Sequence, residues 1–106
     1  MEAGSYRYPI KIKHLVTAQT QSGAVEEVWK IVRHTRAYVN FRAHSRETID
    51  NRISYPGRYE MVVRSYCEIN NNTRIEWQGK TYRVIDWHED MEYNDIVMEI
   101  EQVIDA

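Results

Sequence analysis

The stretch RIEWQGKTYRVID, residues 74–86, decides the fold class of this chain of 106 residues. Two runs in which apolar and polar side chains alternate flank the dipeptide Gln78-Gly79, a pattern that predicts a β-hairpin closed by a two-residue turn. Such a turn needs positive φ angles, which Gly79 adopts without steric cost. Pairing across the turn places one set of side chains on a common face, and these are predicted to lie in the core: Ile75, Trp77, Tyr82 and Val84.

The same alternation appears in three further segments, which the sequence therefore predicts to be strands. They are residues 7–16, 58–67 and 94–105. Polar segments at 17–24 and 87–93 are predicted to be loops, because they lack this alternation and carry turn-forming or charged residues.

The segment EEVWKIVRHTRAYV, residues 26–39, fits two structures. Val28, Ile31 and Val32 would lie on one stripe of a helix, whereas the β-branched and aromatic content favours a strand. As a strand, the segment places Trp29 and Ile31 on one face and Val28 and Val32 on the other. We interpret it as a strand and include Trp29 in the predicted core.

Six predicted strands and no predicted helix indicate an all-β fold for a single domain, residues 1–106. Short antiparallel strands with one apolar face favour a small β-barrel of about six strands, because closure removes the free edges of the sheet. One connection, about 40–57 between the second and third strands, is unusually long. Because it has few apolar anchors, we expect a mobile loop; a surface insertion or a short amphipathic helix also fits.

Charge is distributed unevenly along the chain, whose net charge is −2. Residues 1–64 hold 11 Lys/Arg and 6 Asp/Glu, whereas residues 65–106 hold 3 and 10. One interpretation is that folding mixes the two halves and removes the asymmetry. The other is that the molecule has a basic surface and an acidic surface, which suits head-to-tail association between its own copies.

Nothing in the sequence predicts an enzyme, a cofactor site or a metal site. The four glycines are isolated, and the four histidines show no pair at metal-ligand spacing. The single cysteine, Cys67, ends an apolar strand and is predicted to be a buried thiol. The sequence shows no signal segment and no apolar run long enough to span a membrane, so we expect a soluble cytosolic protein without a membrane partner.

The three tryptophans and eight tyrosines leave a second function open. Aromatic side chains on the outside of a β-barrel can stack the bases of single-stranded nucleic acid. Aromatic residues at alternating strand positions are more often part of the core, which is the interpretation that we favour. A small β-barrel that binds single-stranded nucleic acid is therefore the alternative function.

The C-terminal half, VVRSYCEINNNTRIEWQGKTYRVIDW, resembles a known protein family. The residues that carry the resemblance are Arg64-Ser65-Tyr66, Ile69, Thr73-Arg74-Ile75-Glu76-Trp77, Gly79-Lys80 and Tyr82-Arg83-Val84-Ile85. They are similar to the signature of the head–tail joining proteins of siphophage-type tailed phages, also called head-closure or stopper proteins. Residues 26–39 resemble, more loosely, the tryptophan-containing second strand of that family.

The resemblance implies a structural protein of the virion. Proteins of this family form a ring below the portal that closes the filled capsid, retains its DNA and docks the tail. The implied partners are copies of the chain itself, the portal or adaptor protein above the ring, a tail protein below it and packaged double-stranded DNA. A dodecameric ring is expected in the virion, from a subunit that is monomeric on its own. The implied location is the head–tail interface, after synthesis in the cytoplasm of the bacterial host.

The resemblance also implies a role for the long connection. The family's loop between the second and third strands projects toward the axis of the ring, so residues 40–57 are expected to line the DNA channel. The side chains expected to face the DNA are Arg42, His44, Arg46, Glu47, Asp50 and Arg52. Arginines repeated around a ring would hold phosphates without reading the base sequence.

Overall fold

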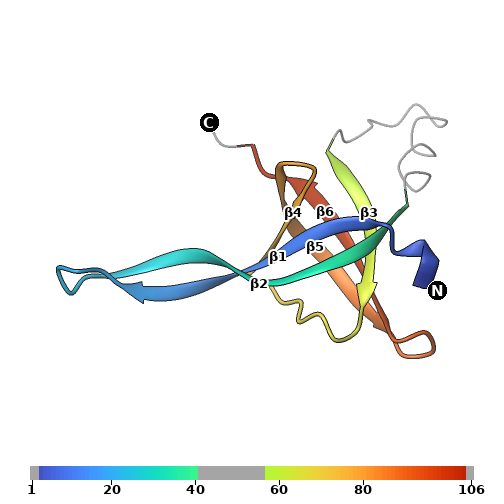
Figure 1. Cartoon of the computed structure of the whole chain (residues 1–106), viewed down its shortest axis with the longest axis horizontal. Coiled ribbons are helices and arrows are strands. Elements are labelled where there is room, and N and C mark those ends of the chain that lie inside the picture. The colour runs from blue at the N-terminus through green and yellow to red at the C-terminus, as the bar shows by residue number, and fades with distance from the viewer. Residues whose placement is uncertain (1–2, 41–56, 105–106) are drawn as a thin grey trace.

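The structure, a computed structural model, describes residues 3–40 and 57–104. A short 3₁₀ helix, η1 (Ala3–Ser5), precedes six strands: β1 (Tyr8–Gln19), β2 (Val25–Asn40), β3 (Arg58–Arg64), β4 (Thr73–Trp77), β5 (Lys80–Asp90) and β6 (Asp95–Gln102). The strands pair antiparallel and close into a barrel in the order β1-β2-β3-β6-β5-β4 (Figure 1). The predicted all-β fold, an antiparallel barrel of six strands, is confirmed.

The hairpin predicted from residues 74–86 forms β4, β5 and their turn. Trp77 lies opposite Lys80, so the loop between the strands has two residues. Gln78 and Gly79 have φ angles of 52° and 74°, both positive as the tightest hairpin turns require. The local pattern therefore predicted both the position and the geometry of this turn.

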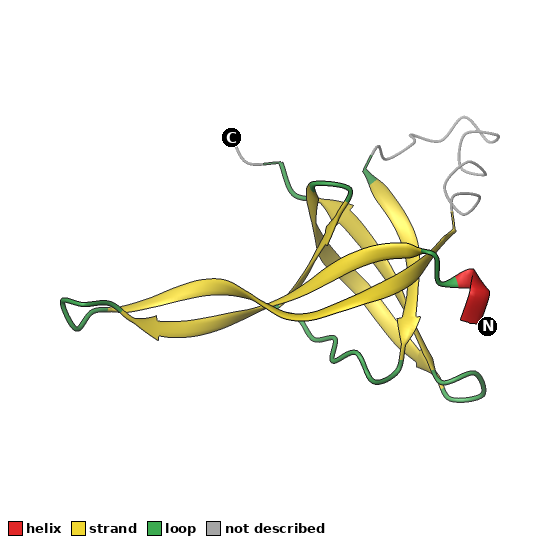
Figure 2. Cartoon of the chain, in the orientation of Figure 1, coloured by secondary structure: helices red, strands yellow, loops and turns green. Residues whose placement is uncertain are grey.

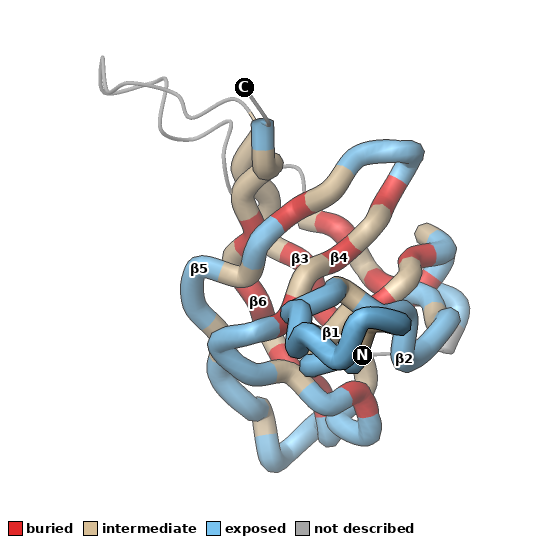
Figure 3. Tube along the Cα trace, turned by 90° about the vertical axis from the view of Figure 1, so that its left-hand side faces the viewer, coloured by how far each residue is buried: buried red, intermediate tan, exposed pale blue. Residues whose placement is uncertain are grey.

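The core fills the interior of the barrel with side chains from all six strands, and Figure 3 shows the buried positions gathered in the barrel wall. Its buried members are Ile10, Ile12, Ala37, Val39, Met61, Val63, Cys67, Ile75, Trp77, Tyr82, Ile96, Met98 and Ile100. Val84 is half-buried and packs against them. The hairpin's predicted inward face is thus the face that the barrel buries.

Four aromatic rings meet inside the barrel, where β1 and β3 begin and β4 gives way to β5. The Trp77 ring lies 5.9 Å from that of Tyr8, 5.1 Å from that of Tyr59 and 5.7 Å from that of Tyr82, between centroids. The pairs with Tyr8 and Tyr59 are edge-to-face, an arrangement that stabilises a core by about 0.5–1.5 kcal/mol per pair beyond the burial of apolar area. Trp77 is the centre of this cluster.

The thiol of Cys67 is buried, as predicted. Burial raises the pKa of this thiol, since the thiolate would lose its hydration. The Arg33 guanidinium and a hydrogen bond with Thr35 oppose that effect only in part. Cys67 is therefore held as a neutral packing residue.

Two strands are longer than the sequence predicted (Figure 2). β1 continues through Gln19 into the segment 17–24, which was predicted to be a loop, and β5 continues through Asp90 into the predicted loop 87–93. Both extensions are polar, and both are held by antiparallel pairing with the next strand. Backbone hydrogen bonding to a partner strand therefore outweighs the polar composition. Residues 26–39 lie in β2, so the helical alternative for them is wrong.

The β1–β2 hairpin extends beyond the barrel. β1 pairs with β4 only over residues 11–14, and β2 pairs with β3 only over residues 38–40. The remainder, residues 15–32, is a two-stranded ribbon that projects from the barrel along the long axis in Figure 1, and we call it the arm. With the arm, the molecule measures 54 × 34 × 22 Å.

A β-bulge lies where the arm begins. Ile12 lies opposite Arg33 and Lys13 opposite Ile31, so Val32 is an extra residue in β2. A bulge bends its strand and increases the local twist. The arm therefore leaves the barrel wall at this point instead of following its curvature.

No helix within the described residues has the length and apolar character needed to cross a membrane.

Candidate functional site

The predicted channel residues fall in a part of the chain that lies outside the described residues. Arg42, His44, Arg46, Glu47, Asp50 and Arg52 all belong to the segment 41–56. Their DNA contacts and the mobility of the loop remain predictions. The structure does show that this segment connects β2 to β3, and it shows how both ends of the connection are held.

The two ends of the connection are anchored to the barrel by hydrogen bonds. On β2, the Asn40 side-chain amide donates to Glu60 Oε2 on β3 at 2.8 Å. Before β3, the Gly57 carbonyl accepts from the Gln102 amide of β6 at 2.8 Å. Gly57 has a φ of 84°, and a Cβ there would lie 3.0 Å from Gln102 Cβ. Glycine is therefore the residue that fits at position 57, where the connection enters β3, without a clash.

A carboxylate close to Gly57 links three strands by ion pairs. Glu101 on β6 pairs with Arg58 Nε of β3 at 2.6 Å and with Arg83 Nη2 of β5 at 2.7 Å. The hydrogen bonds from Arg58 and Arg83 lower the pKa of Glu101. The ionised carboxylate thus bridges strands on either side of β6 where the connection joins the barrel.

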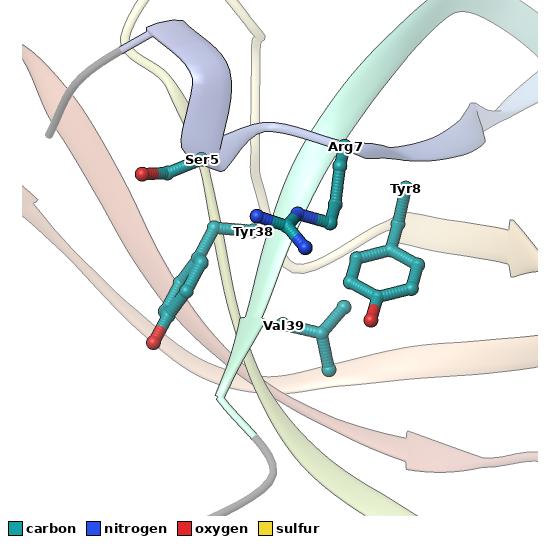
Figure 4. Close-up of a pocket in the computed structure, with 5 residues that line it drawn as sticks. All are labelled: Ser5, Arg7, Tyr8, Tyr38 and Val39. Atoms are coloured by element: carbon teal, nitrogen blue, oxygen red, sulfur yellow. The ribbon is translucent and has the colours of Figure 1, made fainter.

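A pocket of about 260 Å³ opens where β2 ends, beside η1 (Figure 4). It is lined by Ser5, Arg7, Tyr8, Tyr38 and Val39. Figure 4 shows the Arg7 guanidinium reaching toward the space between Tyr8 and Tyr38. One cation with hydroxyl groups suits an anionic group such as a carboxylate or a phosphate. The set contains no paired acid and base, so it does not suggest catalysis.

Metal binding finds no support in residues 3–40 and 57–104. None of their His, Cys, Asp and Glu side chains gather in a group of three or more that could hold an ion.

The prediction that Trp29 belongs to the core is wrong. This residue lies on the arm, opposite Leu15 of β1, and is half-buried. The Arg74 guanidinium lies 4.3 Å from the centroid of its ring, a cation–π contact that covers one side of the indole. The cause is that β2 leaves the barrel wall before it reaches Trp29.

The tryptophans do not form a platform for stacking bases. Trp77 is 2% exposed inside the barrel, Trp29 is covered by Arg74, and Trp87 is half-buried against the core. A single-strand binding barrel presents aromatic faces to solvent. The three tryptophans therefore offer no observation in favour of the alternative function.

The arm exposes apolar side chains that the sequence interpretation had not singled out. Val25 is 71% exposed, Val28 37%, Ile31 40% and Val32 46%. Apolar residues on both faces of residues 25–32 were the available signal, because a ribbon with one buried face would carry them on one side only. Exposed apolar groups on a projecting ribbon are typical of a surface that another protein covers.

The fold and the sequence of the chain were compared with those of known proteins. The solution structure of protein SF1141 from Shigella flexneri 2a superposes with a TM-score of 0.75 at 21% identity, over 100% of both chains. A chain of the virion of the native gene transfer agent particle superposes with a TM-score of 0.60 at 14% identity, over 93% of this chain and 96% of that one. At these identities, the similarity shows a shared fold.

Sequence comparison identifies the family. None of the curated proteins matches the chain in sequence. Residues 1–101 match the family model described as phage head completion protein, which covers η1, the segment 41–56 and the six strands as far as the penultimate residue of β6. The chain therefore belongs to the phage head completion protein family.

Proposed function

We propose that this chain forms a ring that closes the filled phage capsid below the portal, retains the packaged DNA and docks the tail. The observation that carries the proposal is the match of residues 1–101 to the phage head completion family, which makes the chain a structural protein of the virion head. The shared fold with a chain of the gene transfer agent virion supports a place in a particle. The role is structural, without catalysis.

The proposed partners follow from the same placement. Copies of the chain form the ring, with a dodecamer as the expected number. The portal or adaptor protein contacts the ring from above, and a tail protein contacts it from below. The arm supports an assembly role, since its four exposed apolar side chains need a covering surface.

The segment 41–56 is proposed to line the DNA channel. The residues on either side of it lie close together, since Asn40 of β2 pairs with Glu60 of β3, two residues after Arg58 at the start of that strand. Arg42, Arg46 and Arg52, repeated around a ring, would form a positive band that holds phosphates of the DNA end. A single copy contributes few such contacts, so the isolated subunit is expected to bind DNA weakly.

Deletion of the gene tests the proposed function as a whole. In the phage or prophage that encodes the chain, its loss should yield heads that package DNA and then lose it, and tails that do not join. Electron microscopy and the ratio of filled to empty heads measure the outcome. Normal joined particles after deletion, or wild-type virions that lack the chain, would refute the proposal.

A triple variant tests the channel segment separately. Changing Arg42, Arg46 and Arg52 to serine should leave the melting temperature nearly unchanged and should increase DNA leakage or reduce tail joining. The matched control changes the same three residues to lysine, which keeps the positive charge and should retain DNA. Serine-variant virions with normal DNA retention and infectivity would exclude the channel role.

A further inference from the structure

Two opposite walls of the barrel carry opposite charge. The β1–β2 hairpin, residues 8–40, holds 5 Lys/Arg and 2 Asp/Glu, and the β5–β6 hairpin, residues 80–102, holds 2 and 7. In the closed order β1-β2-β3-β6-β5-β4, one strand separates the two hairpins on either side, so they face away from each other. We call them the basic wall and the acidic wall. Folding therefore preserves the charge asymmetry of the sequence.

A row of carboxylates runs from the acidic wall onto the neighbouring β3. The strand register places Glu60 of β3 opposite Glu99 of β6, and Glu99 opposite Asp86 of β5. Their chain neighbours Met61 and Met98 point into the core, so the row points outward. Like charges directly opposite each other destabilise a sheet.

This row lacks the compensation that the neighbouring row has. Glu101 pairs with two arginines, whereas among the described residues no Lys or Arg pairs with Glu99 or Asp86. A row of like charges without counter-charges is costly for the isolated subunit. It becomes favourable when a cationic surface covers it.

The basic wall carries the complementary charge. Lys11 and Lys13 share the single carboxylate of Glu76, at 3.8 Å and 2.8 Å, so their charge is partly balanced within the subunit. Lys30 and Arg33, at the base of the arm, are exposed, and no carboxylate of the described residues pairs with either. Arg33 lies 5.0 Å from the centre of the Tyr66 ring, which leaves its positive charge uncompensated.

Exposed apolar side chains are concentrated on the same two walls. Of the nine large hydrophobic residues that are exposed in the described part of the chain, seven lie on them. Those on the basic wall are Val25, Val28, Ile31 and Val32, and those on the acidic wall are Ile85, Met91 and Tyr93. Each wall thus combines exposed apolar groups with a net charge, positive on one wall and negative on the other, a composition suited to a protein contact.

The face of β2 that carries Lys30 also carries the exposed Val28. The two residues are two positions apart in the strand, so their side chains share one side of the ribbon. On the acidic wall, Asp86 directly follows the exposed Ile85 at a bulge in β5. Both surfaces therefore place an unpaired charge next to an exposed apolar side chain.

We propose that the basic wall of one copy, with its arm, docks on the acidic wall of the next copy. The interface is heterologous: two different surfaces meet head to tail, and a ring results when the rotation between copies closes. A two-fold contact of either wall with itself would bring like charges together. The inference rests on the proposed function, because it names the surfaces by which the ring of that function assembles.

Charge reversal on one wall at a time tests the interface. One variant carries Asp86→Lys and Glu99→Lys, and the other carries Lys30→Glu and Arg33→Glu. Each alone should enter particles at roughly a tenth of the wild-type copy number or less, because its substituted positions then carry the same sign as the positions that they would meet on the next copy. Co-expressed, the two should enter together at near wild-type number, since the new lysines of one variant then meet the new glutamates of the other.

Particle composition by quantitative mass spectrometry is the readout, with both variants first shown to melt as folded proteins. If one does not fold, Asp86→Asn with Glu99→Gln replaces the acidic-wall reversal and Lys30→Gln with Arg33→Gln the basic-wall reversal; each should also reduce incorporation. Incorporation of either reversed variant alone at the wild-type number would overturn the proposed interface. Co-expressed variants that enter particles in no greater number than each variant alone would overturn it as well. Absence of the wild-type chain from particles would instead refute the proposed function, so the two failures are distinguishable.

Discussion

The two halves of β2 (Val25–Asn40) share an extended backbone and differ in their surroundings. In the barrel half, Ala37 and Val39 are 0% and 4% exposed and form part of the core. In the arm half, Val25 and Val32 are 71% and 46% exposed, and β1 is the only strand that pairs with this half. An isolated two-stranded ribbon is marginally stable in water. The barrel therefore stabilises the subunit, whereas the arm depends on the barrel and keeps its apolar groups available for a partner.

Two tryptophans should show the largest difference between these regions. Trp77→Ala removes the centre of the aromatic cluster in the barrel and should cost roughly 3–5 kcal/mol, a large part of the stability of a small domain. Trp29→Ala on the arm should cost about 1 kcal/mol or less, because it loses half-buried area and one cation–π contact. Urea denaturation measures both. Equal losses for the two variants would contradict the division between barrel and arm.

Two valines allow a matched comparison with a smaller effect. Val63→Thr places a hydroxyl in the core, where Val63 is 0% exposed, and should cost about 1–3 kcal/mol. Val28→Thr makes the same change on the arm and should shift stability by about 0.5 kcal/mol or less. The urea midpoint, at an unchanged slope, is the measurement. A destabilised Val28→Thr variant would mean that the arm side chain is buried within the subunit.

The contact between Tyr6, which precedes β1, and the barrel residues Asp95 and Arg64 allows a further test. Tyr6 is buried, its hydroxyl donates to the Asp95 carboxylate, and Arg64 lies 4.3 Å from the centre of its ring. Tyr6→Phe should cost about 1–3 kcal/mol, because a hydrogen bond to a buried carboxylate is lost. Thermal unfolding at neutral pH measures the effect. An unchanged melting temperature would show that the contact contributes nothing.

The same residue predicts an alkaline limit of stability. Burial, together with the hydrogen bond to Asp95, raises the pKa of Tyr6 to about 12. Since an unfolded tyrosine titrates near pH 10, the protonated hydroxyl stabilises the fold below about pH 10 and loses its effect as the pH rises toward 12. Wild-type protein should therefore lose more stability than Tyr6→Phe across this window. Parallel curves for the two proteins would refute the assignment.

The smallest expected effect concerns Glu101 on the barrel. Its pKa is lowered by Arg58 and Arg83, so its contribution is present above the ordinary glutamate pKa of about 4.3 and is lost as the pH falls below it. Glu101→Gln should melt slightly below the wild type at pH 7, and the difference should vanish in acid. Glu27→Gln on the arm is the control and should melt with the wild type at each pH. A difference that persists in acid would require another cause.

The parts of the fold that could be predicted from the sequence depend on neighbouring residues. The turn at Gln78-Gly79 and the inward face of β4 and β5 follow from alternation and from the positive φ angles that the turn requires. The burial of Cys67 follows from its place at the end of an apolar run. Each of these features depends on residues close to one another along the chain, so a short window of sequence is sufficient to predict it.

The candidate surfaces could be predicted only in part. Charge counts in the two halves of the chain raised the possibility of opposite surfaces, and the strand order decides it by placing one strand between the two hairpins on either side. The predicted burial of Trp29 and the predicted ends of β1 and β5 were wrong. Polar or apolar composition does not reveal which part of a strand pairs with a neighbouring strand.

The sequence by itself determined the all-β class, the tight hairpin and the alternation of buried and exposed side chains, because each depends on contacts between residues close along the chain. The tertiary structure alone decided where the barrel wall ends and the arm begins. That boundary depends on β1 meeting β4 and on β2 meeting β3, pairings between segments far apart in the sequence. Only those pairings determine which apolar side chains stabilise the subunit and which remain exposed.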